Sequence, residues 1–522
     1  MVAESPAHGS NKWMVTTAVM LGAFLSVMDT SIVNVALPYM MGNFAETLSA
    51  ITWIATIYTI AAIIVITMTG WLSALMGRKN LYLFSFILFT IGSVLCGTAK
   101  TFPQMLIYRI IQGIGGGALI PISQAILRET FPRKQHGMAM AIFGMGIVLA
   151  PALGPIVGGW LIDHYGWPWI FYINIPISLV GIWMVYHYVH DPEYLKRGIK
   201  KVDWFGISFL MVGLTALQIV LERGQEKNWF DSTFIITWSI VSVVALLALI
   251  FWELWTDEPV VNLRILRNVP FAIGFTVVGI YGIALYGTTF ILPQLTQSLL
   301  GYSAYQSGLT LLPRALTLFI FMPLAGRLYN HIDAKKMIIL GIGVSCWSYA
   351  LLGHLSLNIA FESLVPILLL MGAGMAFVFV PLSTVSLITI PNKDMTNATS
   401  LYTLMQRIGG NVGYAVTVTI LQRRMQFHRS HLVENISASH GRFLDIYHMF
   451  TGYLHKNGYG PVSDRLGTFS FIDHLINRQS TMLSYNDLSW IFMLMFAFVT
   501  LFILFLPHSR TVKSTDEVAL ID

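Results

Sequence analysis

Charged side chains are scarce in this chain. Of its 522 residues, 11% are charged and 55% are hydrophobic, and the mean hydropathy is +0.68. Soluble globular proteins carry roughly 25% charged residues. This deficit excludes a protein that is soluble throughout, and it predicts long segments buried in lipid.

Cysteine is almost absent too. Cys96 and Cys346 lie far apart in different apolar segments, so the sequence offers neither a disulfide framework nor a cysteine metal site. Both residues fit packed apolar side chains. The sequence also contains no nucleotide-binding P-loop, no cluster of metal ligands and no nucleophile motif. We therefore expect no enzyme, no metal and no cofactor.

Long apolar runs are abundant instead. A helix needs about 20 apolar residues to cross a bilayer, and fourteen segments come close to that length. They are 14–37, 51–72, 80–98, 104–127, 137–162, 168–190, 203–222, 233–254, 271–297, 306–330, 336–356, 364–390, 399–422 and 488–507. The first lacks the small-residue cleavage site of a signal peptide. We expect an all-α polytopic membrane protein with 14 transmembrane helices.

The net charge of +6 is distributed unevenly. Lys and Arg residues gather in the loops on the side that holds both termini. The short loops of the other side contain only Lys100, Arg223 and Lys227. Basic residues in short loops mark the cytoplasmic face of a membrane protein. We predict that both termini are cytoplasmic, that the long loop 423–487 lies outside, and that the chain binds no nucleic acid.

The first and last six apolar segments repeat one another. Span 2 ends in GWLSALMGRKNL from Gly70, and span 10 ends in GRLYNHIDAKKM from Gly326, an offset of 256 residues. GIGGGALIP in span 4 also has a counterpart in GAGMAFVFVP of span 12. Spans 1–6 therefore align with spans 9–14, and spans 7 and 8 are an insertion. Two related six-helix halves are typical of transporters, whose substrate site lies where the halves meet.

Acidic residues are nearly absent from the spans. Asp29 lies roughly 14 Å from the outer end of span 1, and Arg109 roughly 8 Å from the outer end of span 4. Ionisable groups inside a membrane are functional by default, and a buried carboxylate near a guanidinium can exchange a proton when its partner moves. We predict proton coupling at Asp29 and Arg109, with Glu222 as a second candidate. A permanently ionised structural pair is the alternative.

Four motifs resemble those of the major facilitator superfamily, and within it the fourteen-span drug:proton antiporters. They are MDTSIVNVALP in span 1, GWLSALMGRK in loop 2–3, YRIIQGIGGG in span 4 and APALGPIVGGWL in span 5. The resemblance implies a major facilitator fold of two six-helix bundles plus two inserted helices. We expect the N-terminal bundle over 1–190, the inserted pair over 191–260, and the C-terminal bundle with its outer loop over 261–522.

The resemblance also implies residue roles. The antiporter motif would bend and pack span 5 so that it seals the substrate path; its residues are Pro151, Gly154, Pro155, Gly158 and Gly159. The loop 2–3 motif would gate the cytoplasmic end; its residues are Gly70, Gly77, Arg78 and Lys79. This chain has Ala74 where the motif usually carries an aspartate. Its basic pair could instead meet the carboxyl ends of helices, or act only as a topology signal.

Polar residues inside the spans are the candidates for the substrate cavity. They are Asn34, Gln112, Gln124, Gln294, Arg314, Gln406 and Arg407. The two arginines of the second half could line the cavity or reach a membrane edge. The spans contain three arginines and one aspartate, an excess of positive charge. Because charges of like sign repel strongly where the dielectric is low, this excess disfavours dicationic substrates.

Three further stretches resemble EmrB-type exporters, the inner-membrane components of tripartite pumps. They are GWPWIFYINIPI, LERGQEKNWF and YGTTFILPQLTQSLLGYSAYQSGL. The resemblance implies the cell inner membrane, a periplasmic adaptor of EmrA type and an outer-membrane channel of TolC type. The loop 423–487, which contains the amphipathic stretch FLDIYHMFTGYLH, would face the adaptor; a disordered spacer is the alternative.

We therefore predict a proton-driven antiporter that exports hydrophobic or amphipathic toxic compounds. Its partners would be small amphipathic substrates, protons and the lipid bilayer. One alternative is a proton-coupled exporter of a single physiological solute, such as a siderophore or lipid. A membrane sensor on a carrier scaffold is the remaining class.

Overall fold

The structure is a computed structural model that describes residues 11–192, 202–434, 441–456 and 460–506. The described residues are helical apart from short connections. The first half contains α1 (Lys12–Phe44), α2 (Leu48–Ile51), α3 (Trp53–Met76), α4 (Arg78–Thr98), α5 (Phe102–Thr130), α6 (His136–Tyr165), α7 (Trp169–Tyr172) and α8 (Asn174–Tyr188). The inserted pair is α9 (Trp204–Arg223) and α10 (Thr233–Trp255).

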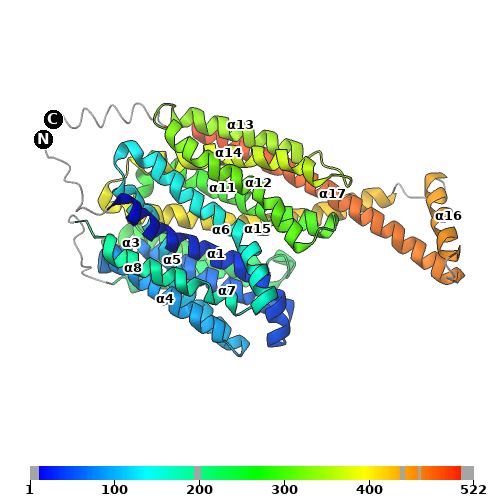
Figure 1. The fold of residues 1–522 in the computed structure, drawn as a ribbon, viewed down its shortest axis with the longest axis horizontal. Coiled ribbons are helices and arrows are strands. Elements are labelled where there is room, and N and C mark those ends of the chain that lie inside the picture. Colours follow the sequence, from blue (N-terminus) through cyan, green and yellow to red (C-terminus); the bar gives the residue numbers. More distant parts are fainter. Residues whose placement is uncertain (1–10, 193–201, 435–440, 457–459, 507–522) are drawn as a thin grey trace.

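The second half contains α11 (Val269–Gln294), α12 (Ala304–Leu328), α13 (Ala334–Leu352), α14 (Phe361–Ile388), α15 (Met395–Glu434), α16 (Gly441–Lys456) and α17 (Pro461–Leu504). Short turns of 3₁₀-helix lie at Arg133–Gln135, Trp229–Asp231, Leu263–Arg267 and Asn392–Asp394, and a π-turn lies at Leu295–Leu299. In Figure 1 the long helices run side by side, and α16 projects beyond them with the adjoining part of α17.

Thirteen helices in the described part of the chain are long and apolar enough to cross a membrane. The remaining predicted span, 399–422, lies within α15. The polar side chains of Gln406, Arg407 and Asn411 lower the hydropathy of this helix. It packs against α3, α11 and α17, so protein rather than lipid surrounds much of it. The predicted all-α polytopic fold is confirmed.

Small residues bring the two halves together where α3 meets α15 and α6 meets α12. A Cβ at Gly326 would lie 2.8 Å from the carbonyl oxygen of Gly137. Gly70, the counterpart of Gly326 in the sequence repeat, lies against Asn397 at the start of α15, where a Cβ would clash. The repeated glycines thus mark equivalent interfaces, because only glycine lets the helices approach this closely.

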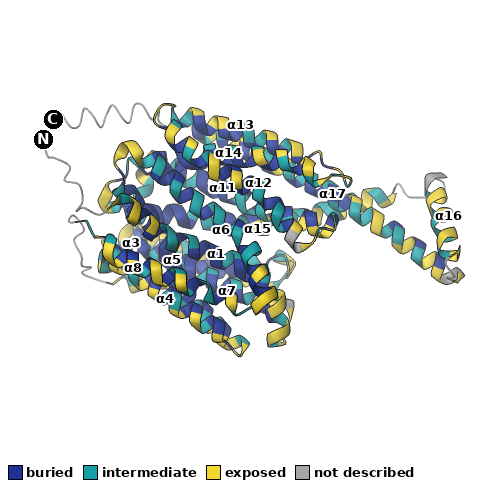
Figure 2. Cartoon of the chain, viewed as in Figure 1, coloured by how far each residue is buried: buried dark blue, intermediate teal, exposed yellow. Residues whose placement is uncertain are grey.

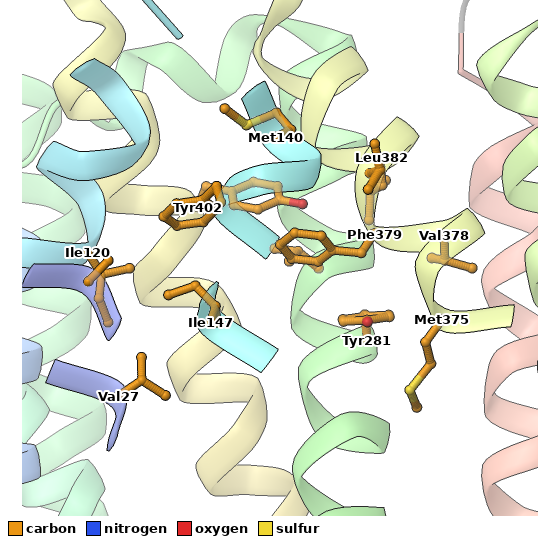
Figure 3. Packing of buried hydrophobic residues seen from close by; sticks show 14 of the residues in the cluster. Val27, Ile120, Met140, Ile147, Tyr281, Met375, Val378, Phe379, Leu382 and Tyr402 are labelled. Carbon is orange, nitrogen blue, oxygen red and sulfur yellow. The ribbon is translucent and has the colours of Figure 1, made fainter. Parts of the chain in front are cut away.

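A large apolar cluster closes the space between the halves. Figure 3 shows Val27, Ile120 and Ile147 of the first half opposite Phe379 and Tyr402 of the second. All five are buried. In Figure 2, buried residues line the surfaces that face other helices, and exposed residues lie on the outside and along α16. We call the five residues Val27, Ile120, Ile147, Phe379 and Tyr402, which lie where the halves meet, the plug.

The segment 423–487, expected as a long outer loop, is largely helical. Helix α15 continues to Glu434, α16 covers 441–456, and α17 begins at Pro461. With 40 residues, α15 is roughly 60 Å long at 1.5 Å per residue, about twice the hydrocarbon thickness. Arg424 and His428 of α15 contact Asp487 of α17 at 2.5 and 2.6 Å, so the two helices pair here. We call this paired region together with α16 the stalk; it covers 423–434, 441–456 and 460–487.

Candidate functional site

A cavity of about 1610 Å³ lies between the two halves. Its lining comes from α1, α3, α6, α9, α11, α12 and α15. On α1, α3, α6, α9, α11 and α12, the lining residues lie toward the end nearest the stalk, and on α15 they lie before the part that forms the stalk. The plug lies at the other end of the cavity, so within the described residues the cavity opens only on the stalk side.

Four of the predicted polar residues line this cavity: Asn34, Glu222, Gln294 and Arg407. Arg407 lies deepest of the four, one helical turn below Asn411 on α15 and near the floor. Asn34 and Gln294 are exposed to the open space. The cavity therefore combines a guanidinium at its floor with amide side chains nearer its mouth.

The other cavity candidates do not line it in this structure. Gln112 is buried inside the first half, and Gln124 is buried where α5 meets α6, with its Nε2 donating to Met140 Sδ at 3.7 Å. Arg314 is buried behind the wall and donates to Thr289 Oγ1 at 2.7 Å. Gln406 is half-buried, and its backbone lies against Gly282. Helix rotation, which hydropathy does not encode, decides each of these positions.

Asp29 and Arg109 do meet, and they form a closed polar cluster within the first half. Arg109 Nη1 donates to Asp29 Oδ2 at 2.6 Å, and both side chains are 0% exposed. Gln112 Nε2 and Asn174 Nδ2 donate to Asp29 Oδ1 at 2.7 and 3.1 Å. The carboxylate thus joins α1 to α5 and α8.

Arg109 is held from several sides. Its Nε donates to the carbonyl oxygen of Ile54 at 3.0 Å, and its Nη1 also donates to Gln112 Oε1 at 2.6 Å. Its guanidinium lies 4.2 Å from the ring centroid of Tyr58, an arrangement that stabilises a cation. Burial of a charge requires this kind of compensation.

Sequence analysis missed two members of this cluster. Asn174, which begins α8, also donates to Ser93 Oγ at 3.1 Å. The asparagine lies in the apolar run YINIPI of a predicted span, which could have identified it as a buried polar group. Ser93 gave no such signal, because serine is common in membrane helices.

The antiporter motif of α6 has two faces. Gly154 and Gly158 pack on α1, where a Cβ would lie 2.7 Å from Ser31 and from Ile32 respectively. Pro151, Pro155 and Gly159 line the cavity. Ser31 Oγ donates to the carbonyl oxygen of Pro151 at 3.0 Å. The motif therefore connects the cavity wall to the helix that carries Asp29.

The residues predicted to gate the cytoplasmic end lie at the closed end of the cavity. Arg78 is buried, pairs with Glu129 and donates through Nη2 to the carbonyl oxygen of Asn392 in the second half at 3.1 Å. Lys79 Nζ donates to the carbonyl oxygen of Tyr186, in the last turn of α8, at 2.6 Å. Gly77 has φ 83° where α3 turns into α4, a conformation that favours glycine.

Arg128 adds a further contact between the halves at this end. Its Nη1 lies 3.4 Å from the carbonyl oxygen of Thr384, in the last turns of α14. Carboxyl ends of helices favour cations. Basic residues thus meet backbone carbonyls across the interface of a chain that has Ala74 in place of the usual acid.

The inserted helices form part of the cavity wall. Helix α9 packs between α3 and α15, and α10 packs on α9. At the mouth, Arg223 donates to the Oγ and carbonyl oxygen of Ser49 at 2.8 and 2.7 Å. Ser49 and then Arg223 hold the pKa of Glu226 below its usual value through hydrogen bonds. Trp229 Nε1 donates to Thr419 of α15 at 2.9 Å, so this turn touches both halves.

Comparison with known proteins supports the same architecture. The Major Facilitator Superfamily model matches residues 19–414. The chain belongs to the major facilitator superfamily. It is a multi-pass membrane transporter and not an enzyme, and the predicted family is confirmed.

Relatives of this major facilitator transporter include named exporters. Multidrug export protein EmrB of Escherichia coli K12 is 31% identical over 94% of both chains. EmrB of Haemophilus influenzae is 32% identical over 93% of this chain and 94% of its own. Fatty acid resistance protein FarB of Neisseria gonorrhoeae is 31% identical over 92% of this chain and 94% of its own.

Solved structures share the fold. The human organic anion transporter MFSD10 (TETRAN) has a TM-score of 0.58 at 13% identity, covering 93% of this chain and 99% of its own. The proton:xylose symporter XylE has a TM-score of 0.58 at 17% identity, covering 95% and 96%. At these identities, the likeness concerns the fold alone.

Proposed function

We propose that this transporter exports hydrophobic or amphipathic toxic compounds in exchange for protons. The observation that carries the proposal is the fully buried Asp29–Arg109 pair on α1 and α5. Residues that flank Asp29, Thr30 and Ser31, line the cavity. The same helix, α1, therefore carries the Asp29 carboxylate on the side that packs inside the first half and carries residues of the cavity wall on another side.

The arrangement offers a route from conformation to protonation. Three N–H donors occupy the carboxylate oxygens of Asp29 in this conformation. When rocking of the halves moves α1 against α5 or α8, the carboxylate loses donors, and an unpaired buried charge costs several kcal/mol. Uptake of a proton removes that cost, so protonation follows the state of the transporter.

The test is substrate transport driven by an imposed pH gradient in protein reconstituted in liposomes, comparing wild type with Asp29→Asn. We expect gradient-driven transport in the wild type and none in the variant, because asparagine keeps the size of the side chain but carries no acidic proton. A matched control is Asp163→Asn, an exposed carboxylate of the cavity lining. Normal gradient-driven transport by the Asp29 variant contradicts the proposal.

We propose an orientation in the cell inner membrane with both termini cytoplasmic and the stalk periplasmic. The relatives named EmrB support this placement, as does the distribution of basic residues in short loops. The termini and the basic residues at 193–201 lie outside the described residues. In this orientation, the cavity opens away from the cytoplasm.

We further propose that the stalk binds a periplasmic adaptor of EmrA type, which leads to an outer-membrane channel of TolC type. The stalk extends roughly 30 Å past a membrane span. Along α16, Met449 and Tyr453 are 69% and 61% exposed. Apolar side chains exposed on a projecting helix favour a protein partner.

The double change Met449→Glu and Tyr453→Glu tests this partner. We expect unaltered transport in liposomes but loss of resistance in whole cells, because export across two membranes needs the docking surface and transport across one does not. The measurement pairs a liposome assay with a drug panel on cells. Loss of liposome transport by the correctly folded variant would assign the stalk to the carrier itself.

A further inference from the structure

The inserted pair brings a carboxylate into the cavity that neither six-helix half supplies. Three carboxylates of the described residues line the cavity: Asp163, Glu222 and Glu226. Asp163 and Glu226 are exposed at the mouth, whereas Glu222 is half-buried in the wall near the end of α9. Asp29 is fully buried and does not line the cavity.

A chain of neutral side chains holds Glu222. Gln218 Nε2 donates to Glu222 Oε2 at 3.0 Å, and Asn411 Nδ2 of α15 donates to Gln218 Oε1 at 2.6 Å. These bonds fix the position of the carboxylate between α9 and α15. They supply no positive charge to it.

Arg223, which is adjacent to Glu222 in the sequence, makes its contacts with other groups. The adjacent Arg223 binds Ser49, pairs with Glu226 at 2.6 Å and lies 4.8 Å from the ring centroid of Trp53. No salt bridge within the described residues involves Glu222. The nearest cation, Arg223, is thus shared with Glu226 and Ser49 and forms no salt bridge with Glu222.

The elements packed around Glu222 carry few other ionisable groups. On α15, Tyr414 lines the cavity near the carboxylate, and Arg407 lies about two helical turns deeper, roughly 10 Å along the axis. The neighbouring part of α3 presents Thr56. An aromatic pair lies beside this region, because the rings of Phe290 and Tyr414 are 4.5 Å apart and both line the cavity.

We propose that Glu222 binds the positive charge of an amphipathic monocation, which replaces a proton on the same carboxylate. A half-buried carboxylate without a cation is costly unless it holds a proton or meets a positive ligand. The proton leaves the oxygen for cavity water as the cation arrives, so the net charge of the wall together with its ligand stays constant. The aromatic pair supplies faces that attract organic cations.

The inference deepens the proposed function, on which it rests, by assigning a substrate class to the wall of the cavity. It also disfavours dications. Glu222 is the one half-buried carboxylate among the described residues of the lining. A second positive charge that reached deeper would approach Arg407. Monocations with an apolar body fit both constraints.

The test uses purified full-length protein, with tetraphenylphosphonium as the monocation and tetraphenylborate as an anion of similar shape. Calorimetry in weak buffer measures affinity, and a pH indicator measures released protons. We expect wild type to bind the cation with release of about one proton per cation. Glu222→Gln, which keeps an acceptor for Gln218, should weaken cation binding about tenfold or more and release none, equivalent to at least about 1.4 kcal/mol.

Glu362→Gln is the matched control, because it neutralises an exposed carboxylate in the first turn of α14 that does not line the cavity; it should bind and release protons as wild type does. Unchanged binding by Glu222→Gln, equal weakening by both variants, or stronger binding of the anion overturns the inference. Asp29→Asn should retain cation binding. If Glu222→Gln binds the cation as wild type does while Asp29→Asn abolishes coupled transport, this inference alone is rejected. If Glu222→Gln weakens cation binding as expected while Asp29→Asn keeps coupled transport, the proposed function alone is rejected.

Discussion

Asp29 connects three helices of the first half of the transporter through hydrogen bonds. Its carboxylate accepts hydrogen bonds from Arg109, Gln112 and Asn174, which come from two other helices. Removal of one member of a buried ion pair is more harmful than neutralisation of both, because a single variant leaves a charge uncompensated.

At this scale, we predict non-additive stability effects. Arg109→Ala should lower the free energy of unfolding by about 3–5 kcal/mol, since it leaves the Asp29 charge buried without its cation. Asp29→Asn combined with Arg109→Gln should cost less than the two single variants added together. Thermal unfolding in detergent measures wild type, Arg109→Ala, the single variants Asp29→Asn and Arg109→Gln, and their double variant. Additivity within about 0.5 kcal/mol would show that the two side chains do not interact.

Sequence alone identified this pair, because an aspartate and an arginine stand out in apolar runs. It did not identify Asn174 as their partner. The contact depends on how α8 is rotated against α1 and α4, and rotation is set by packing across the bundle. The side-chain amide of Asn174 is polar enough to suggest a buried contact. Such amides are too common in membrane helices for the sequence to assign this one to Asp29.

At the scale of the element, α6 presents small residues to α1 and a different set to the cavity. Gly158 meets Ile32, whereas a Cβ at Gly159 would have no neighbour within 4 Å. Adjacent glycines of one motif thus offer opposite environments.

We predict that Gly158→Val destabilises the transporter by about 1–3 kcal/mol, because the added methyl groups force α6 away from α1. Gly159→Val is the matched control and should leave stability within about 0.5 kcal/mol, since its side chain enters open space. Thermal unfolding and transport in liposomes measure the two variants. Equal losses would mean that the valine acts through helix propensity rather than through contact with α1.

The stalk shows where sequence patterns fail for an element. Segment 423–487 is too polar for a membrane span, so hydropathy ends one helix near 422 and begins the next near 488. In the structure, α15 and α17 continue past those limits as a pair held by Arg424–Asp487 and Arg429–Asp473 contacts at 2.5 and 2.8 Å. The helices continue where the hydropathy falls, because a pair of polar helices is stable in water.

The whole molecule has a cavity open at one end and closed at the other. The plug shown in Figure 3, together with Arg78 and Arg128, joins the halves on the closed side. Alternation of access requires these contacts to break while new contacts form at the stalk end.

Single cysteines should report this asymmetry in whole cells. In a background with Cys96→Ala and Cys346→Ala, Asn34→Cys should react with a membrane-impermeant maleimide, because Asn34 is exposed in the open cavity. Lys393→Cys, which is exposed at the closed end, should react only after the membrane is disrupted. Labelling is read by mass shift on a gel. The reverse pattern would contradict the orientation proposed above.

The sequence by itself determined the membrane class, the repeat of two six-helix halves, the inserted pair and the meeting of Asp29 with Arg109. These features follow from composition, from spacing and from the cost of charge in lipid, which act locally along the chain. Tertiary structure alone decided that Arg407 and Glu222 face the cavity while Gln112, Gln124 and Arg314 do not. A span keeps the same hydropathy under any rotation about its axis, so only packing against neighbouring helices selects which side chains line the path.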